Sequence, residues 1–160
     1  MCCAGISFRG PTKMFISPSG AKINADLYIQ NVLKPLIEKE IPRLCGKEAH
    51  KVVLHQDNAP AHQARKTQEY LRQSEVKFIP REHWIGNSPD LAPMDFAVSG
   101  IFMGLLFNKK PRDDTGLVRA IKTAWVKLPM EKIERALQSW KRRVELMIER
   151  KGFQIERLLN

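Results

Sequence analysis

The sequence predicts an α/β fold in which a layer of strands is flanked by helices and closed by a helical C-terminal cap. Three observations predict it. The patterns indicate elements in the order strand, strand, helix, strand, helix, strand and then helices. Apolar residues make up 43% of the 160 residues, which can fill the core of one compact domain over residues 1–160. No run of 18 apolar residues occurs, so no membrane-spanning helix is expected.

The first half of the chain contains all of the predicted strands. Residues 2–8 form a strand, residues 9–12 a Gly-Pro turn, and residues 13–17 the returning strand of a hairpin. Asn24 is the predicted cap of a helix that Pro35 should kink and that Pro42 and Gly46 should end. The β-branched run 51–55 predicts a buried strand. An exposed helix over 61–73 and a short strand over 76–79 are expected to follow.

The second half is predicted to be helical after a loop over residues 80–93. Pro93 suits the first turn of a helix over 94–107, and Asp113 begins the cap of a helix over 116–127. A last helix starts after Pro129 and carries an apolar stripe made of Ile133, Leu137, Trp140, Val144, Met147 and Ile148. Four cations lie off this stripe and are expected to face solvent: Lys132, Arg135, Arg142 and Arg143.

The charge of the chain indicates a polyanionic partner. Lysine and arginine number 27 against 17 acidic residues, and residues 108–160 alone contribute +7 of the net +10. Nucleic acid and an anionic membrane both fit this excess, and an ordinary solvated helical surface is the alternative. The three cysteines show no CxxC spacing, so neither a disulfide framework nor a zinc site is predicted, and a reducing compartment is expected.

Two carboxylates occupy positions where α/β proteins often bind ligands. Asp57 directly follows the predicted strand 51–56, and Asp95 lies in the first turn of an apolar helix, where the helix dipole favours a charged carboxylate. Such a pair could share a divalent cation. The alternative is that Asp57 only caps the turn before Pro60 and that Asp95 is an ordinary first-turn acid.

Two short segments resemble the catalytic domain of mariner-like transposases of the Tc/mariner superfamily. Residues 53–62, Val-Leu-His-Gln-Asp-Asn-Ala-Pro-Ala-His, are similar to the segment around the second catalytic aspartate of that family. Residues 88–96, Ser-Pro-Asp-Leu-Ala-Pro-Met-Asp-Phe, are similar to the segment around the third. The 37 residues between Asp57 and Asp95 fit a known spacing subclass, and the resemblance covers roughly residues 1–150.

The resemblance implies a DDE endonuclease with an RNase H-like mixed sheet flanked by helices. By position, Asp57 matches the second metal ligand and Asp95 the third, with Mg2+ or Mn2+ as the implied cofactor. Asp90 is the alternative for the third ligand, although it matches a non-catalytic loop aspartate. Asn58 and His62 match supporting positions, where His62 orients a phosphate or a carboxylate or serves as a structural hydrogen-bonding group. In this family water cleaves the DNA strand, and the freed 3′-hydroxyl then attacks the target.

The sequence departs from the family at one catalytic position. The first aspartate is expected on a strand just before the one that begins at Cys2, and no residue of this sequence matches it. Asp26 falls in a helical first turn and does not replace it. The helix-turn-helix region is also unmatched. We therefore expect a partial domain without its first strand, inactive in cleavage by itself; the alternative is a domesticated or relic module that binds DNA or another partner without catalysis.

The resemblance also implies the partner and the compartment. DNA is the expected partner, no membrane is expected, the family allows a homodimer, and the nucleus is the implied location. Trp140 is predicted to belong to the core. The candidates for contacts with the DNA backbone are the basic residues near the C-terminus: Lys141, Arg142, Arg143, Arg150 and Lys151.

Overall fold

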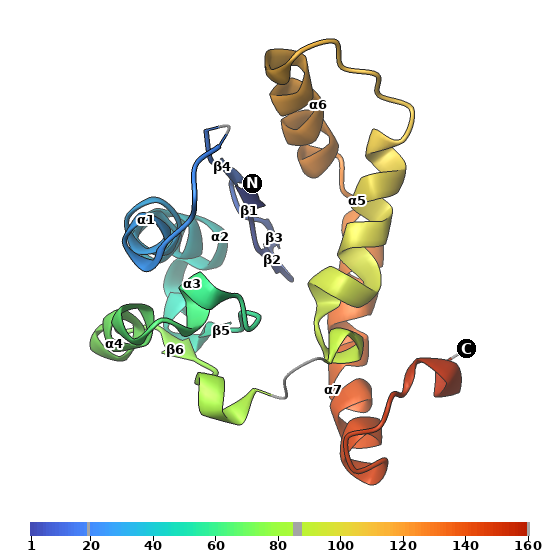
Figure 1. Cartoon of the computed structure of the whole chain (residues 1–160). Coiled ribbons are helices and arrows are strands. Elements are labelled where there is room, and N and C mark those ends of the chain that lie inside the picture. Colours follow the sequence, from blue (N-terminus) through green and yellow to red (C-terminus); the bar gives the residue numbers. More distant parts are fainter. Residues whose placement is uncertain (19, 85–87, 160) are drawn as a thin grey trace. The chain divides into compact units, whose positions relative to one another are not determined.

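Two compact units make up the chain in a computed structural model, which describes residues 1–18, 20–84 and 88–159. Unit 1 comprises Met1–Ala4 and Thr12–Gly86, and unit 2 comprises Gly5–Pro11 and Asn87–Asn160. Unit 1 contains the strand ladders β1–β4 and β5–β6, whereas unit 2 is almost entirely helical (Figure 1). Of the helices in the described ranges, none is both long enough and apolar enough to cross a membrane.

The predicted single sheet is replaced by three two-stranded ladders in the described part of the chain. β1 (Cys2–Cys3) pairs with β4 (Phe15–Ile16), and β2 (Ile6–Ser7) pairs with β3 (Gly10–Pro11), both antiparallel. β5 (Val53–Leu54) pairs with β6 (Lys77–Phe78) in parallel. Both pairing directions of a mixed sheet are therefore present, but each strand is only two residues long and no ladder joins another.

The hairpin near the N-terminus turns earlier than predicted. Residues 9–12 were expected to form the turn, yet Gly10 and Pro11 are paired with β2. The Ser7 hydroxyl explains this position, because it accepts a hydrogen bond from the Arg9 N–H and donates one to the Gly10 carbonyl. Gly10 has φ of 121°, a conformation that side chains disfavour.

The core of unit 1 forms where the first long helical segment meets α4 (Arg65–Gln73), which lies beside α1 (Ala25–Tyr28) (Figure 1). The Asn24 side chain caps α1 by accepting from the Leu27 N–H, as predicted. The segment continues through π-helical turns at Ile29–Leu33 and Leu36–Glu40, on either side of Pro35, into α2 (Ile41–Cys45) and a 3-10 turn at Gly46–Lys51. Tyr28, Ile29 and Leu33 of this segment are buried and cluster with Leu71 of α4.

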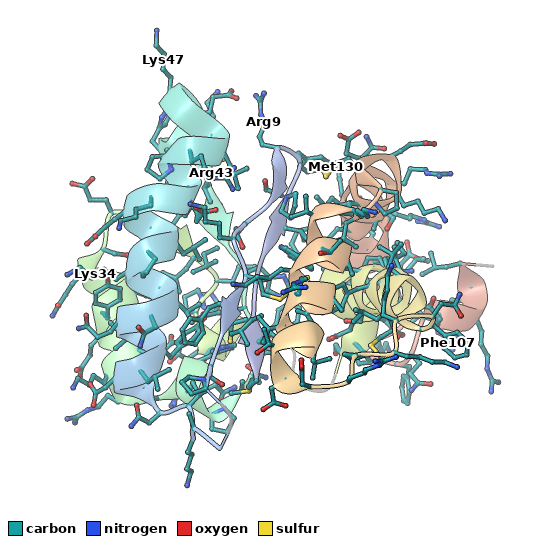
Figure 2. All side chains as sticks on the ribbon, turned by 90° about the horizontal axis from the view of Figure 1, so that it is seen from above. Arg9, Lys34, Arg43, Lys47, Phe107 and Met130 are labelled. Atoms are coloured by element: carbon teal, nitrogen blue, oxygen red, sulfur yellow. The ribbon has the colours of Figure 1, made fainter. Side chains whose placement is uncertain are left out.

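A buried carboxylate ties the helical segment to the chain entering β4. Glu40 is 6% exposed and accepts hydrogen bonds from the Lys13 backbone N–H at 2.8 Å and from Arg43 Nη2 at 2.6 Å. The Arg43 hydrogen bond lowers the pKa of Glu40, so this carboxylate stays charged. By contrast Lys34 and Lys47 are exposed and project away from the same segment (Figure 2).

The helix expected over residues 61–73 is two helices. α3 (Pro60–Gln63) stops at Ala64, whose extended ψ of 137° separates it from α4. The break leaves carbonyl groups of α3 without intrahelical partners, and two buried side chains of α4 satisfy them. Thr67 Oγ1 donates to the Ala61 carbonyl at 2.7 Å, and Gln68 Nε2 donates to the His62 carbonyl at 2.9 Å.

Unit 2 contains the helices predicted for the second half. A π-helical turn at Met94–Val98 leads into α5 (Ser99–Leu106), and Phe102 of α5 packs edge-on against Trp125 of α6 (Asp114–Val126). Asp113 caps α6 through Gly116 N–H, as predicted. Phe107, just after α5, is 85% exposed and projects outward (Figure 2). α7 (Met130–Glu149) follows Pro129.

Two predictions for α7 are wrong, one for a residue on the apolar stripe and one for a residue off it. Ile148 was expected in the core but is 70% exposed, whereas Arg143 was expected in solvent but is only 8% exposed. The buried positions of α7 are Ile133, Ala136, Arg143, Leu146 and Met147. Spacings of three and seven residues from Trp140 place Arg143 and Met147 on its face, so helical periodicity itself contained this signal.

Candidate active site

Asp57 presents its carboxylate at the end of the β5 segment. Oδ1 accepts the Ala59 N–H at 3.0 Å and the His62 Nδ1–H at 2.6 Å, while the side chain is 62% exposed. The hydrogen bond from His62 lowers the pKa of Asp57, and the Ala59 N–H acts in the same direction. The carboxylate is therefore charged and accessible near neutral pH, as a cation ligand must be.

His62 is itself held in place by unit 1. Its ring lies against Tyr28 with centroids 4.3 Å apart, and its carbonyl accepts from Gln68. Burial raises the pKa of Tyr28, so the hydroxyl stays protonated and donates to Gln56 Oε1 at 2.8 Å. The sequence left three roles open for His62: orienting a phosphate, orienting a carboxylate, or structural hydrogen bonding. The structure shows a hydrogen bond between His62 and the Asp57 carboxylate. Asn58 is exposed, and its supporting role stays a prediction.

Breaking the His62–Asp57 contact should raise the pKa of Asp57. Because the folded-state pKa is lowered, the contact stabilises the fold above the unfolded value of about 3.9 and is lost as pH falls through the folded value. His62→Leu should move the Asp57 pKa up towards its ordinary value, whereas His62→Gln keeps a donor and should move it less. A pH titration of the Asp57 carboxyl carbon by NMR measures this, with exposed His50→Leu as control. An unchanged pKa in His62→Leu would contradict the assignment.

Asp95 lies at the start of the helical segment of unit 2, as predicted. Its side chain is exposed, and its backbone N–H donates to the Ala92 carbonyl at 2.8 Å. Asp90, the alternative ligand, is already engaged, because its Oδ2 accepts the Ile155 N–H at 2.9 Å. This contact gives the Asp90 carboxylate a structural role in unit 2.

The two candidate ligands belong to different units, Asp57 to unit 1 and Asp95 to unit 2. Their predicted approach to a shared cation stays a prediction. Mg2+ prefers oxygen ligands such as carboxylates, so the side chains of both residues are of a type that can bind the implied metal. Over the residues that the structure describes, however, no group of three or more His, Cys, Asp or Glu side chains could hold a metal ion.

The basic candidates divide into two groups. Lys141, Arg142, Arg150 and Lys151 are exposed, and Arg142 has only a loose ion pair, 3.9 Å from Glu149. Arg143 is buried and engaged by its neighbours, so its predicted contact with the DNA backbone does not fit its position. We name the four exposed cations the α7 basic end.

Trp140, in the middle of α7, is half-buried, and its Nε1–H donates to the Leu91 carbonyl at 2.9 Å. Trp140 was predicted to belong to the core; it contributes to the packing of unit 2 but is only half-buried.

Comparison with known structures defines the class of fold. The catalytic domain of the Mos1 mariner transposase superposes with a TM-score of 0.80 at 22% identity, covering 97% of this chain and 75% of that one. The Mos1 mariner paired-end complex with Mn gives a TM-score of 0.83 at 21% identity over 97% of this chain and 44% of that one. The chain has the RNase H-like fold of the Mos1 catalytic domain, built here mostly of helices with small sheets.

A relative in sequence supports the same class. The transposable element Tcb1 transposase of Caenorhabditis briggsae is 22% identical over 151 residues, 94% of this chain and 51% of that protein. The chain thus spans about half the length of this relative. No family model matches the sequence. Together these comparisons confirm the resemblance to the catalytic domain of Tc1/mariner transposases that the two motifs predicted.

Proposed function

We propose that this chain is the DNA-acting catalytic region of a mariner-type transposase and that Asp57 and Asp95 are its metal-binding carboxylates. The observation that carries the proposal is the Asp57 carboxylate, oriented by His62 and open to solvent within the Mos1 catalytic-domain fold. A bound Mg2+ or Mn2+ would neutralise charge on the phosphodiester. His62 would keep one oxygen of Asp57 occupied and leave the other for the cation.

The chain alone is expected to bind DNA without cutting it. Only two of the three carboxylates of the family are matched in this sequence, so both metal affinity and geometry should be insufficient. The purified chain should leave supercoiled plasmid intact with Mg2+ or Mn2+, as measured on agarose gels beside the Asp57→Ala, Asp95→Ala double variant. Nicking by the wild-type chain that disappears in this variant would contradict the expected inactivity and support the two ligands.

A non-enzymatic DNA-binding or interaction module is the second candidate, and the α7 basic end favours it. The two candidates predict different results. A non-enzymatic module would retain DNA binding, and its metal binding, measured by titration, would not depend on Asp57 or Asp95.

For either candidate we propose that the protein acts in the nucleus, which localisation of a fluorescent fusion tests. Sedimentation of the purified chain tests the homodimer.

A further inference from the structure

We infer that Arg143, together with Trp140 and Asp90, is a positioning assembly for Asp95. The inference rests on the proposed function, because it takes Asp95 as a ligand. The side chain of Asp95 is exposed on the first turn of its helix. A metal-binding side chain at an exposed position needs neighbouring groups that hold the backbone of its own residue in place.

The carbonyls of the loop before Asp95 show how that backbone is fixed. Those of Ser88, Pro89 and Ala92 accept backbone N–H groups within the loop and the first helical turn. Of the five carbonyls of residues 88–92, the other two are bound by side chains of α7: the Asp90 carbonyl by Arg143 Nη1 and the Leu91 carbonyl by Trp140 Nε1, both at 2.9 Å. Unmet carbonyls are costly, so these two bonds hold the loop against α7.

Arg143 also contacts the residue that follows Asp95. Its guanidinium carbon lies 3.6 Å from the centroid of the Phe96 ring, within the range of a cation–π interaction. One guanidinium therefore touches the chain on both sides of Asp95, at Asp90 and at Phe96. Glu156 Oε2 balances its charge from 2.9 Å away.

Asp90 completes the assembly from the other side. Its Oδ2 binds the backbone N–H of Ile155, which is completely buried, so the segment after α7 is joined to the same loop. Residues 88–96 contain two aspartates, Asp90 and Asp95, and this contact gives Asp90 a structural role rather than a role in metal binding. Loop, α7 and C-terminal segment converge on the residues next to Asp95 but leave its carboxylate exposed.

The test compares Arg143→Met, Arg143→Lys and the exposed neighbour Arg142→Met in the full chain. Hydrogen exchange of single amides by NMR should be about 10-fold faster at Asp95 and Phe96 in Arg143→Met, because a hydrogen bond and a ring contact are lost. Exchange in α6 should not change. Arg143→Lys keeps a cation and a donor and should restore part of the protection, and Arg142→Met should resemble the wild type.

A titration with Mn2+ separates positioning from a purely structural role. Because the proposed cation is shared, Arg143→Met should raise the Mn2+ concentration needed to broaden the Asp95 and Asp57 signals together, whereas Arg142→Met should leave it unchanged. Equal acceleration of exchange across α5, α6 and α7 would overturn the inference, as would unchanged exchange at Asp95. If Mn2+ broadens neither aspartate in the wild type, the proposed metal site fails while exchange still decides the positioning. Should Arg143→Met not fold, Trp140→Phe removes one bond to the loop and must show the same local pattern.

Discussion

Raising the salt concentration from about 50 mM to about 200 mM is expected to weaken binding of random-sequence duplex DNA about 150-fold. The four exposed cations of the α7 basic end are the reason: Lys141, Arg142, Arg150 and Lys151. Each phosphate neutralised contributes about −0.9 to the slope of log affinity against log salt, so four contacts give a slope of about −3.6. Fluorescence anisotropy titrations at several salt concentrations measure this slope. Binding should be weak and independent of sequence, because phosphate contacts do not identify bases.

Matched charge variants decide where the DNA lies. Changing the four cations of the α7 basic end to glutamine should remove most of the slope. The control changes four exposed lysines of unit 1 to glutamine and alters the net charge equally: Lys22, Lys34, Lys39 and Lys47. If both variants weaken binding equally, only net charge matters and the α7 basic end is not a site. Binding that does not respond to salt would refute the backbone-contact proposal altogether.

Local chemistry explains which parts of the fold were predictable. Asn24 and Asp113 cap helices through their own neighbours, and Pro129 precedes the start of α7, so a few adjacent residues contain the information. The strand predicted at 51–55 was found only at Val53–Leu54, and Val53 is 55% exposed rather than buried. A β-branched run predicts a strand, but burial depends on which elements cover it.

Contacts between distant residues explain the rest. Helical spacing places Arg143 on the face of Trp140, but its partners Asp90 and Phe96 lie about 50 residues earlier in the chain, and no local pattern identifies them. The break at Ala64 is similar, since buried Thr67 and Gln68 make it tolerable. Motif similarity predicted Asp57, Asp95 and a supporting role for His62. It left open whether His62 orients a phosphate, orients a carboxylate or is a structural hydrogen-bonding group, and the structure shows a hydrogen bond to the Asp57 carboxylate.

Leu71→Ala should lower the free energy of unfolding by about 2–5 kcal/mol, the usual cost of a large cavity in a core. Leu71 has no exposed surface and packs with Tyr28, Ile29 and Leu33. Alanine is a good helix former, so α4 itself should persist and the loss should come from packing. Since domains are stable by only about 5–15 kcal/mol, urea denaturation should show a large shift in midpoint.

The same substitution should also affect the candidate site. Leu54 and Ala61, which precede and follow Asp57 in the sequence, pack against the cluster that contains Leu71. We therefore expect the amides next to Asp57 to exchange faster in Leu71→Ala. The matched control is Val53→Ala, which removes an apolar side chain that is 55% exposed and should change stability by less than about 0.5 kcal/mol. If Leu71→Ala costs no more than Val53→Ala, the cluster is not the core that supports Asp57, and the site must be held by the His62 and Ala59 hydrogen bonds alone.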